Sequence, residues 1–191
     1  MSEMPDGLNN KSYVMSLRID HDVVEALKEQ AKADRVSMNV LVNNVLRNHV
    51  EWERDAKMAG FIPITKDMLT SILQKVSDQD VELIVEHTKD IIKAQIIYME
   101  KKYDLQSFMH WLQNRCRASG FSAKEFYQND VFMCIIQHEL GWKWSVYFKA
   151  LIKTVLDELL SGKIDFDISP SMLIFRIMTD RQTKQSAMEI A

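Results

Sequence analysis

Seven residues near the N-terminus, Tyr13 to Ile19, read Y-V-M-S-L-R-I and alternate large apolar with smaller or polar side chains. A period of two is typical of a half-buried strand, with Tyr13, Met15, Leu17 and Ile19 on one face. No other segment before residue 163 has a strand pattern, and a lone strand is not stable. The sequence therefore predicts that a second copy supplies the partner strand across a two-fold axis.

Two amphipathic helices are predicted directly after this strand. Asp20 is a suitable N-cap for the first, which would run to about Ala33, and Ser37 for the second. The turn between them, residues 34–36, contains no glycine, so we expect one of its residues to adopt left-handed backbone at some cost. The apolar residues of both helices recur at helical spacing: Val23, Val24, Leu27 and Ala31 in the first, and Met38, Leu41, Val42, Val45, Leu46 and His49 in the second.

The order of strand, capped helix, tight turn and Ser-capped helix resembles the Arc/MetJ-type ribbon-helix-helix DNA-binding proteins, also called the CopG class. The resemblance covers Ser12 to about Val50, with L-R-I-D before the first helix and V-S-M-N at the start of the second. It implies a homodimer whose paired strands enter the major groove of double-stranded DNA. The expected fold class is mainly α: an intertwined ribbon-helix-helix module, then an α-helical bundle with a small C-terminal β-hairpin.

The resemblance also implies which residues contact DNA. The outward side chains of the strand, Val14, Ser16 and Arg18, would read base edges. Arg18 would be the main reader, because a guanidinium can bond O6 and N7 of guanine together, worth about 1–3 kcal/mol of discrimination. The start of the second helix would bind the backbone through its free N–H groups. The implied phosphate-binding residues are Lys11, Ser37, Met38 and Asn39.

The charge of this region is unusual for a DNA-binding module. Residues 1–55 contain seven Lys or Arg and ten Asp or Glu, and the whole chain has a net charge of −3. Phosphate contacts dominate the affinity of most DNA-binding proteins, which therefore present a basic surface. We expect weak non-specific DNA binding and a strong dependence of binding on the shape of the dimer.

Composition bounds the remaining possibilities. The chain has 191 residues, of which 47% are hydrophobic and 27% charged, enough for one or two domains with a proper core. It contains two cysteines, no signal-like N-terminus and no apolar run near twenty residues in length. These features predict a cytoplasmic protein that does not enter a membrane. The polar residues 1–11 are expected to form a flexible arm.

Glycine and proline mark the predicted domain boundary. The second helix is expected to continue past Val50 until Gly60, Phe61 and Pro63 end it. The first domain would thus span residues 12–59. A helical domain, residues 60–178, and a polar tail, residues 179–191, would follow.

The second domain is predicted to be almost entirely helical up to its last strands. Helices would start at Thr65, Ser77, Asp104, Ser122 and Trp142, the fourth because Ser122 and Glu125 have the spacing of a capping box. That fourth helix would carry Phe126, Val131, Ile135 and Ile136 until Gly141 ends it. Alternation over residues 164–169 and 172–177, around Pro170-Ser171, predicts the small hairpin.

Few residues of the second domain suggest chemistry. Cys134 and His138, four apart, would share a helical face, and in the sequence Cys116 precedes them and Trp142 and Trp144 follow. Thiolate and imidazole can bind a soft metal or haem, but two ligands do not specify either, and a packed cysteine beside a buried histidine is the alternative. Asp165 and Asp167 share one face of a strand and are interpreted as its solvated side. No catalytic residue, cofactor or metal is expected.

The sequence thus predicts a site-specific DNA-binding transcription regulator, not an enzyme, that forms a homodimer or a tetramer. Its C-terminal domain would oligomerise or sense a small-molecule effector. Two alternatives stay open. The chain could be an antitoxin-like protein that binds a partner protein through its C-terminal domain. That domain could instead be a cofactor- or metal-binding sensor or enzyme fused to a DNA anchor.

Overall fold

A computed structural model describes residues 13–128 and 130–178. The chain divides into two compact units, Met1–Leu46 and Arg47–Ala191, which are described separately below. The predicted arm at residues 1–11, which includes Lys11, and the predicted tail at residues 179–191 lie outside the described residues. The domain limits inferred from the sequence stay predictions.

The N-terminal unit contains the two helices expected from its pattern, α1 (His21–Ala33) and the first part of α2 (Met38–Asn48). Backbone hydrogen bonds end α1, among them one from the Val36 N–H to the Ala31 carbonyl at 3.0 Å. This bond pattern requires left-handed backbone at the residue between helix and loop. Arg35 adopts it, with φ 56°, as the missing glycine led us to expect.

The predicted N-terminal strand is wrong for this chain. Residues 13–19 belong to none of the strands in the described structure, and every side chain among them is exposed. The physical reason is that a strand is defined by hydrogen bonds to a partner. The strand pairings of the described residues are all among the four strands of the C-terminal unit, and none includes residues 13–19.

Beyond α2 the helical run continues without a break through a π-helical segment, His49–Glu53, and α3 (Arg54–Ala56). It ends as predicted at Gly60, which has φ 90°, and at Phe61, whose N–H donates to the Ala56 carbonyl at 3.0 Å. The longer helices of the C-terminal unit are α4 (Lys66–Leu73), α5 (Asp78–Glu100), α6 (Leu105–Ala118) and α7 (Trp142–Leu159).

Side-chain caps start three of these helices where the sequence predicted. The hydroxyl of Thr65 accepts a hydrogen bond from the Met68 N–H, and the Asp104 carboxylate accepts one from the Ser107 N–H. Ser77 makes the full reciprocal capping box, with an aspartate three residues on. These caps satisfy N–H groups that the first turn of a helix leaves free.

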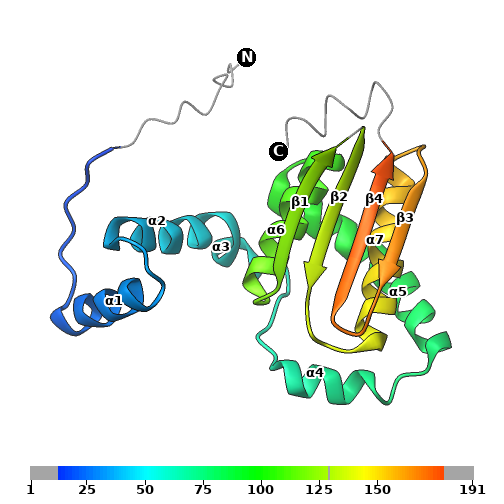
Figure 1. The fold of residues 1–191 in the computed structure, drawn as a ribbon, viewed down its shortest axis with the longest axis horizontal. Helices are drawn as coiled ribbons and strands as arrows, with labels where there is room; N and C mark the ends of the chain where they lie inside the picture. Colours follow the sequence, from blue (N-terminus) through cyan, green and yellow to red (C-terminus); the bar gives the residue numbers. More distant parts are fainter. Residues whose placement is uncertain (1–12, 129, 179–191) are drawn as a thin grey trace. The chain divides into compact units, whose positions relative to one another are not determined.

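A four-stranded antiparallel sheet in the order β1-β2-β4-β3 completes the C-terminal unit (Figure 1). This corrects the predicted fold class, because the segment from Ser122, predicted to be a helix, forms a β-hairpin. The hairpin at residues 164–177 is present, but as half of the larger sheet. The strands are β1 (Ser122–Gln128), β2 (Val131–Gln137), β3 (Ile164–Ile168) and β4 (Met172–Met178).

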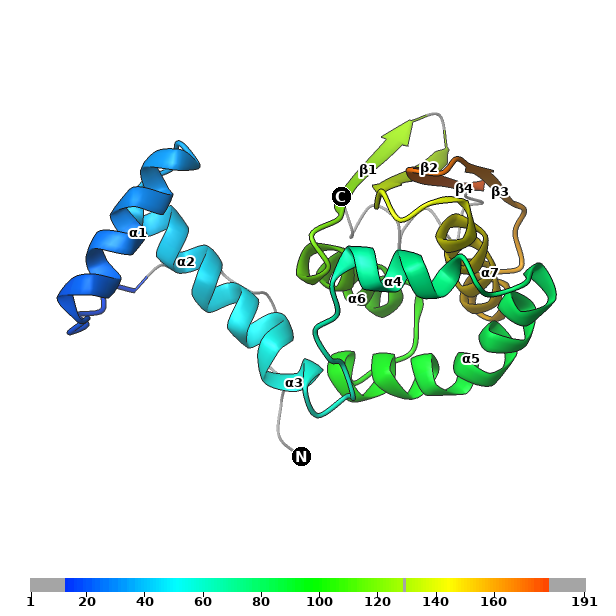
Figure 2. The same ribbon diagram turned by 90° about the horizontal axis from the view of Figure 1, so that it is seen from below.

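The helices cover one face of this sheet (Figure 2). Helices α6 and α7 lie against the strands, and α5 packs on both helices from the side away from the sheet. The core between these layers includes Trp111, Phe108, Phe148 and Phe175, all fully buried. None of the described helices is both long and apolar enough to cross a membrane.

Candidate nucleic-acid interface

The segment predicted to read DNA bases, residues 13–19, is exposed along its whole length. Val14 is 103% exposed and Tyr13 86%, and Ser16 and Arg18 are exposed as well. The segment runs into α1 through Asp20, whose extended backbone, φ −62° and ψ 146°, makes the turn into the helix. The roles of Val14, Ser16 and Arg18 stay predictions, because both faces of the segment are open in one chain.

The start of α2, predicted to bind phosphate, has the expected local geometry. The Ser37 hydroxyl accepts a hydrogen bond from the Val40 N–H at 3.2 Å, so Ser37 is the N-cap. Ser37 and Asn39 are exposed, and Met38 is half-buried. The N–H groups of a helix's first turn lack acceptors within the helix, and the dipole makes that end positive. An anion could therefore approach Met38 and Asn39 from solvent.

Acidic and basic residues lie in different parts of the N-terminal unit. The acids of described residues 13–46 begin at Asp20 and lie on or beside the helices, and Glu25 pairs with Lys28 at 2.7 Å. Arg18 is the sole charged residue of segment 13–19. The acidic net charge of the region therefore coexists with a positive charge on the segment itself.

The Cys134 and His138 pair, considered as metal ligands, does not form. Cys134 lies within β2 and His138 just after it, and four positions along a strand span about 13 Å rather than one helical turn. Burial raises the pKa of both thiols, that of Cys116 to about 12, so both are neutral. The proposed spacing depended on a helix that is absent here.

His138 instead holds three chain segments together in the interior. Its Nδ1 accepts a hydrogen bond from the Leu140 N–H at 3.0 Å, so Nε2 carries the proton and donates to the Ser145 hydroxyl at 2.9 Å. That hydroxyl donates to the Ser169 carbonyl. Burial lowers the pKa of His138 to about 4. The imidazole is therefore neutral, and neither of its nitrogens is free for a metal or a proton transfer.

The remaining candidate acids are engaged in ion pairs at the surface of the sheet. Asp165 lies 3.4 Å from the Lys163 ammonium, and Asp167 pairs with the Arg176 guanidinium. Across residues 13–128 and 130–178, no three His, Cys, Asp or Glu side chains gather closely enough to hold one metal ion.

Sequence reasoning missed a second polar cluster, formed by Glu100, His110 and Asn114. His110 Nδ1 lies 2.7 Å from the Glu100 carboxylate, which raises the pKa of His110. His110 Nε2 lies 3.2 Å from Asn114 Nδ2, while Asn114 Oδ1 is buried without a partner. Turning the Asn114 amide over would let Oδ1 accept from a protonated Nε2. Because the residues lie on two helices, their spacing gives no sequence signal.

An apolar pocket in the C-terminal unit is the best candidate for the predicted small-molecule effector. It has a volume of about 700 Å³ and lies beside the π-helical segment, with Lys57 among its lining residues. This volume suits a small organic ligand. Its apolar walls come from Trp52, Ala56, Phe61, Ile62, Pro63 and Ala118.

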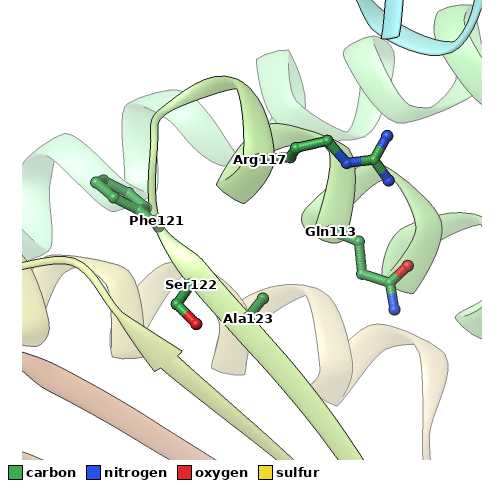
Figure 3. A pocket seen from close by; sticks show the side chains of 5 residues that line it. All are labelled: Gln113, Arg117, Phe121, Ser122 and Ala123. Carbon is green, nitrogen blue, oxygen red and sulfur yellow. The ribbon is translucent and has the colours of Figure 1, made fainter. Parts of the chain in front are cut away.

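A smaller pocket of about 400 Å³ lies between the end of α6 and the start of β1 (Figure 3). Gln113 and Arg117 extend from α6, and Phe121 to Ala123 form the segment that leads into the strand. The Arg117 guanidinium already donates to the Glu51 carboxylate at 3.2 Å. The most obvious anion-binding group of this pocket is therefore occupied within the chain.

Comparison with known proteins adds no assignment. No family model matches the chain, and no curated protein matches it significantly. The ribbon-helix-helix resemblance of residues 12–50 accordingly stays a prediction.

Proposed function

We propose that the chain is a site-specific DNA-binding regulator that acts as a homodimer through its N-terminal unit. The observation that carries the proposal is the exposure of residues 13–19, an alternating apolar segment with an arginine near its end. The apolar pocket beside the π-helical segment would serve the C-terminal unit as an effector site.

The lack of a core in the N-terminal unit supports the proposed dimer. Among described residues 13–46, Ala31 and Leu41 are the buried side chains. Burying apolar surface is worth about 25 cal/mol per Å², so a second copy that covers this surface would be strongly favoured. Its exposed apolar residues are Tyr13, Val14, Met15, Leu17, Ile19, Val23, Val36, Val40, Val45 and Leu46.

DNA binding is supported by the polar groups that this segment and α2 offer. Arg18 forms no ion pair with another described residue, so its guanidinium can bond a guanine edge. The capped start of α2 can hold a phosphate, which positions a protein without reading sequence. Two copies would provide two Arg18 side chains and two phosphate sites, as expected for a two-fold repeated target.

The test first selects a preferred duplex from random DNA. Fluorescence polarisation titrations then measure the affinity of the protein for that duplex and for a scrambled one. We expect Arg18→Ala to reduce the discrimination between them by about 1–3 kcal/mol. Lys32→Ala is the matched control, because it removes an exposed positive charge from the end of α1 and should leave discrimination unchanged. Absence of any selected sequence, or equal discrimination by the Arg18→Ala variant, would reject the proposal.

A further inference from the structure

No helix described in the C-terminal unit covers the face of the sheet opposite α6 and α7 (Figure 2). The strands carry an apolar patch on this face. Its side chains alternate along the strands with those that enter the core. Phe126 is 47% exposed and Met178 54%, and the others are half-buried. The members of this outer patch are Phe126, Val131, Met133, Ile135, Met172, Ile174 and Met178. Contiguous exposed apolar surface of this kind marks an interaction site.

Charge across the outer patch is arranged with opposite signs at the two edges. One row of paired residues crosses the sheet from Lys124 on β1, through Ile135 and Ile174, to Asp167 on β3. Lys124 forms no ion pair with any other residue that the structure describes. Asp165 lies on the same edge as Asp167. The patch is therefore an apolar centre with Lys124 at one edge and, at the other, two carboxylates that each pair with a cation of the same chain.

We propose that the outer patch packs face to face against the same patch of a second copy, about a two-fold axis parallel to the strands between β2 and β4. This rotation puts β1 of one copy over β3 of the other, because the sheet order is β1-β2-β4-β3. Lys124 then faces Asp167 of the second copy, and Ile135 faces Ile174. The two isoleucines form the centre of the contact.

The charge pattern selects this axis over the alternative. A two-fold axis across the strands would place β1 over β1, bringing the two Lys124 side chains to one edge and the acids to the other. Like charges held together oppose association. Stacked sheets lie about 10 Å apart with their strands within about 30° of each other, so facing side chains at the edges can meet.

The proposed contact would bury one charged side chain near the centre of the patch, that of Arg176. Arg176 lies in the row beside the isoleucines, and it enters the contact already paired with Asp167. Lys124 of the second copy would add a second cation to that carboxylate. The contact involves only the C-terminal unit. The proposal can therefore be tested separately from the proposed dimer of the N-terminal unit.

Crosslinking of the full chain tests the contact. Lys124→Cys and Asp167→Cys are introduced together, and the protein is treated with a short bismaleimide. In one chain these positions are three strand spacings apart, about 14 Å, which exceeds the reach of the reagent. The native Cys116 and Cys134 are buried and should not react. We expect a covalent dimer from the double variant and none from either single variant or the native chain.

Further variants identify what covers the patch. Ile174→Glu, added to the double variant, should abolish the covalent dimer, whereas Ile91→Glu, at a site 55% exposed on α5, should leave it unchanged. Absence of the covalent dimer from the double variant would overturn the proposal. Dimer formation by Lys124→Cys alone would overturn the axis. Crosslinking that appears only after residues 179–191 are deleted would assign the patch to that segment instead of a second copy.

Discussion

The two units of this chain differ in how their apolar side chains are covered. The C-terminal unit buries Trp111, Phe108 and Phe148 completely in its own core. The described part of the N-terminal unit has a similar apolar pattern but leaves most of it exposed, with Ala31 and Leu41 as its buried side chains. Patterning alone therefore does not show whether a segment folds around itself. We therefore expect the first unit to be stable only when something outside it covers its apolar surface.

The strongest test of this difference removes a core side chain of the C-terminal unit. Phe148 is fully buried and packs beside Trp144, with 5.5 Å between the ring centroids. Phe148→Ala should lower the free energy of unfolding by about 3–5 kcal/mol through lost burial and a residual cavity. Denaturant unfolding followed by tryptophan fluorescence measures this change.

Leu17→Asp is the contrasting variant in the N-terminal unit. Leu17 is 55% exposed, so the main unfolding transition of the C-terminal unit should stay within about 0.5 kcal/mol of the native chain. A loss of several kcal/mol from Leu17→Asp, or a negligible one from Phe148→Ala, would contradict the division into a self-sufficient and a dependent unit.

The buried histidine of the C-terminal unit predicts a loss of stability in acid. Burial lowers the pKa of His138 from 6.5 to about 4, so the unfolded chain binds a proton in this range that the folded chain excludes. The stabilisation is present above pH 6.5 and lost as the pH falls to about 4, in total about 3 kcal/mol. Unfolding free energies measured at several pH values should show this loss, and His138→Gln should remove that part of the pH dependence.

His110, in the same unit, should change the stability in the opposite direction as the pH rises. The Glu100 carboxylate raises the pKa of His110, so its contribution is present below pH 6.5 and lost as the pH rises through the raised value. His110 is about half exposed, so its effect should be smaller. If His110→Gln and His138→Gln changed the pH dependence in the same direction, the assigned environments would be wrong.

The helix ends were predictable because the responsible groups are close in sequence. Ser77 caps a helix with an aspartate three residues away, and Gly60 ends one with the positive φ that glycine allows. The turn at Arg35 was predictable for the same reason, from the absence of a glycine. None of these features requires knowledge of distant contacts.

The β1-β2 hairpin was not predicted because its signals compete. Val131 to Ile136 is a continuous apolar run, which fits a buried strand or a buried helix equally well. The overlooked signal is the Asn129-Asp130 pair, since the register leaves two residues between the strands and Asp130 has φ 59°. The error extended to the candidate site, because the Cys134 and His138 pairing assumed helical spacing. The N-terminal strand failed differently, since its partner would lie outside the chain.

The smallest expected effect concerns a feature that the two units share. Backbone bonds of the same pattern end α1 and α6, but the left-handed residue is Arg35 in the first helix and Gly120, with φ 66°, in the second. A side chain in this conformation costs about 1 kcal/mol, which glycine avoids. Arg35→Gly should therefore stabilise α1 by up to about 1 kcal/mol, whereas Gly120→Ala should destabilise the C-terminal unit by a similar amount.

Hydrogen exchange of the α1 amides measures the effect of Arg35→Gly, and denaturant unfolding measures the effect of Gly120→Ala. Faster exchange in α1 of the Arg35→Gly variant would show that the arginine side chain contributes more than its backbone strain costs.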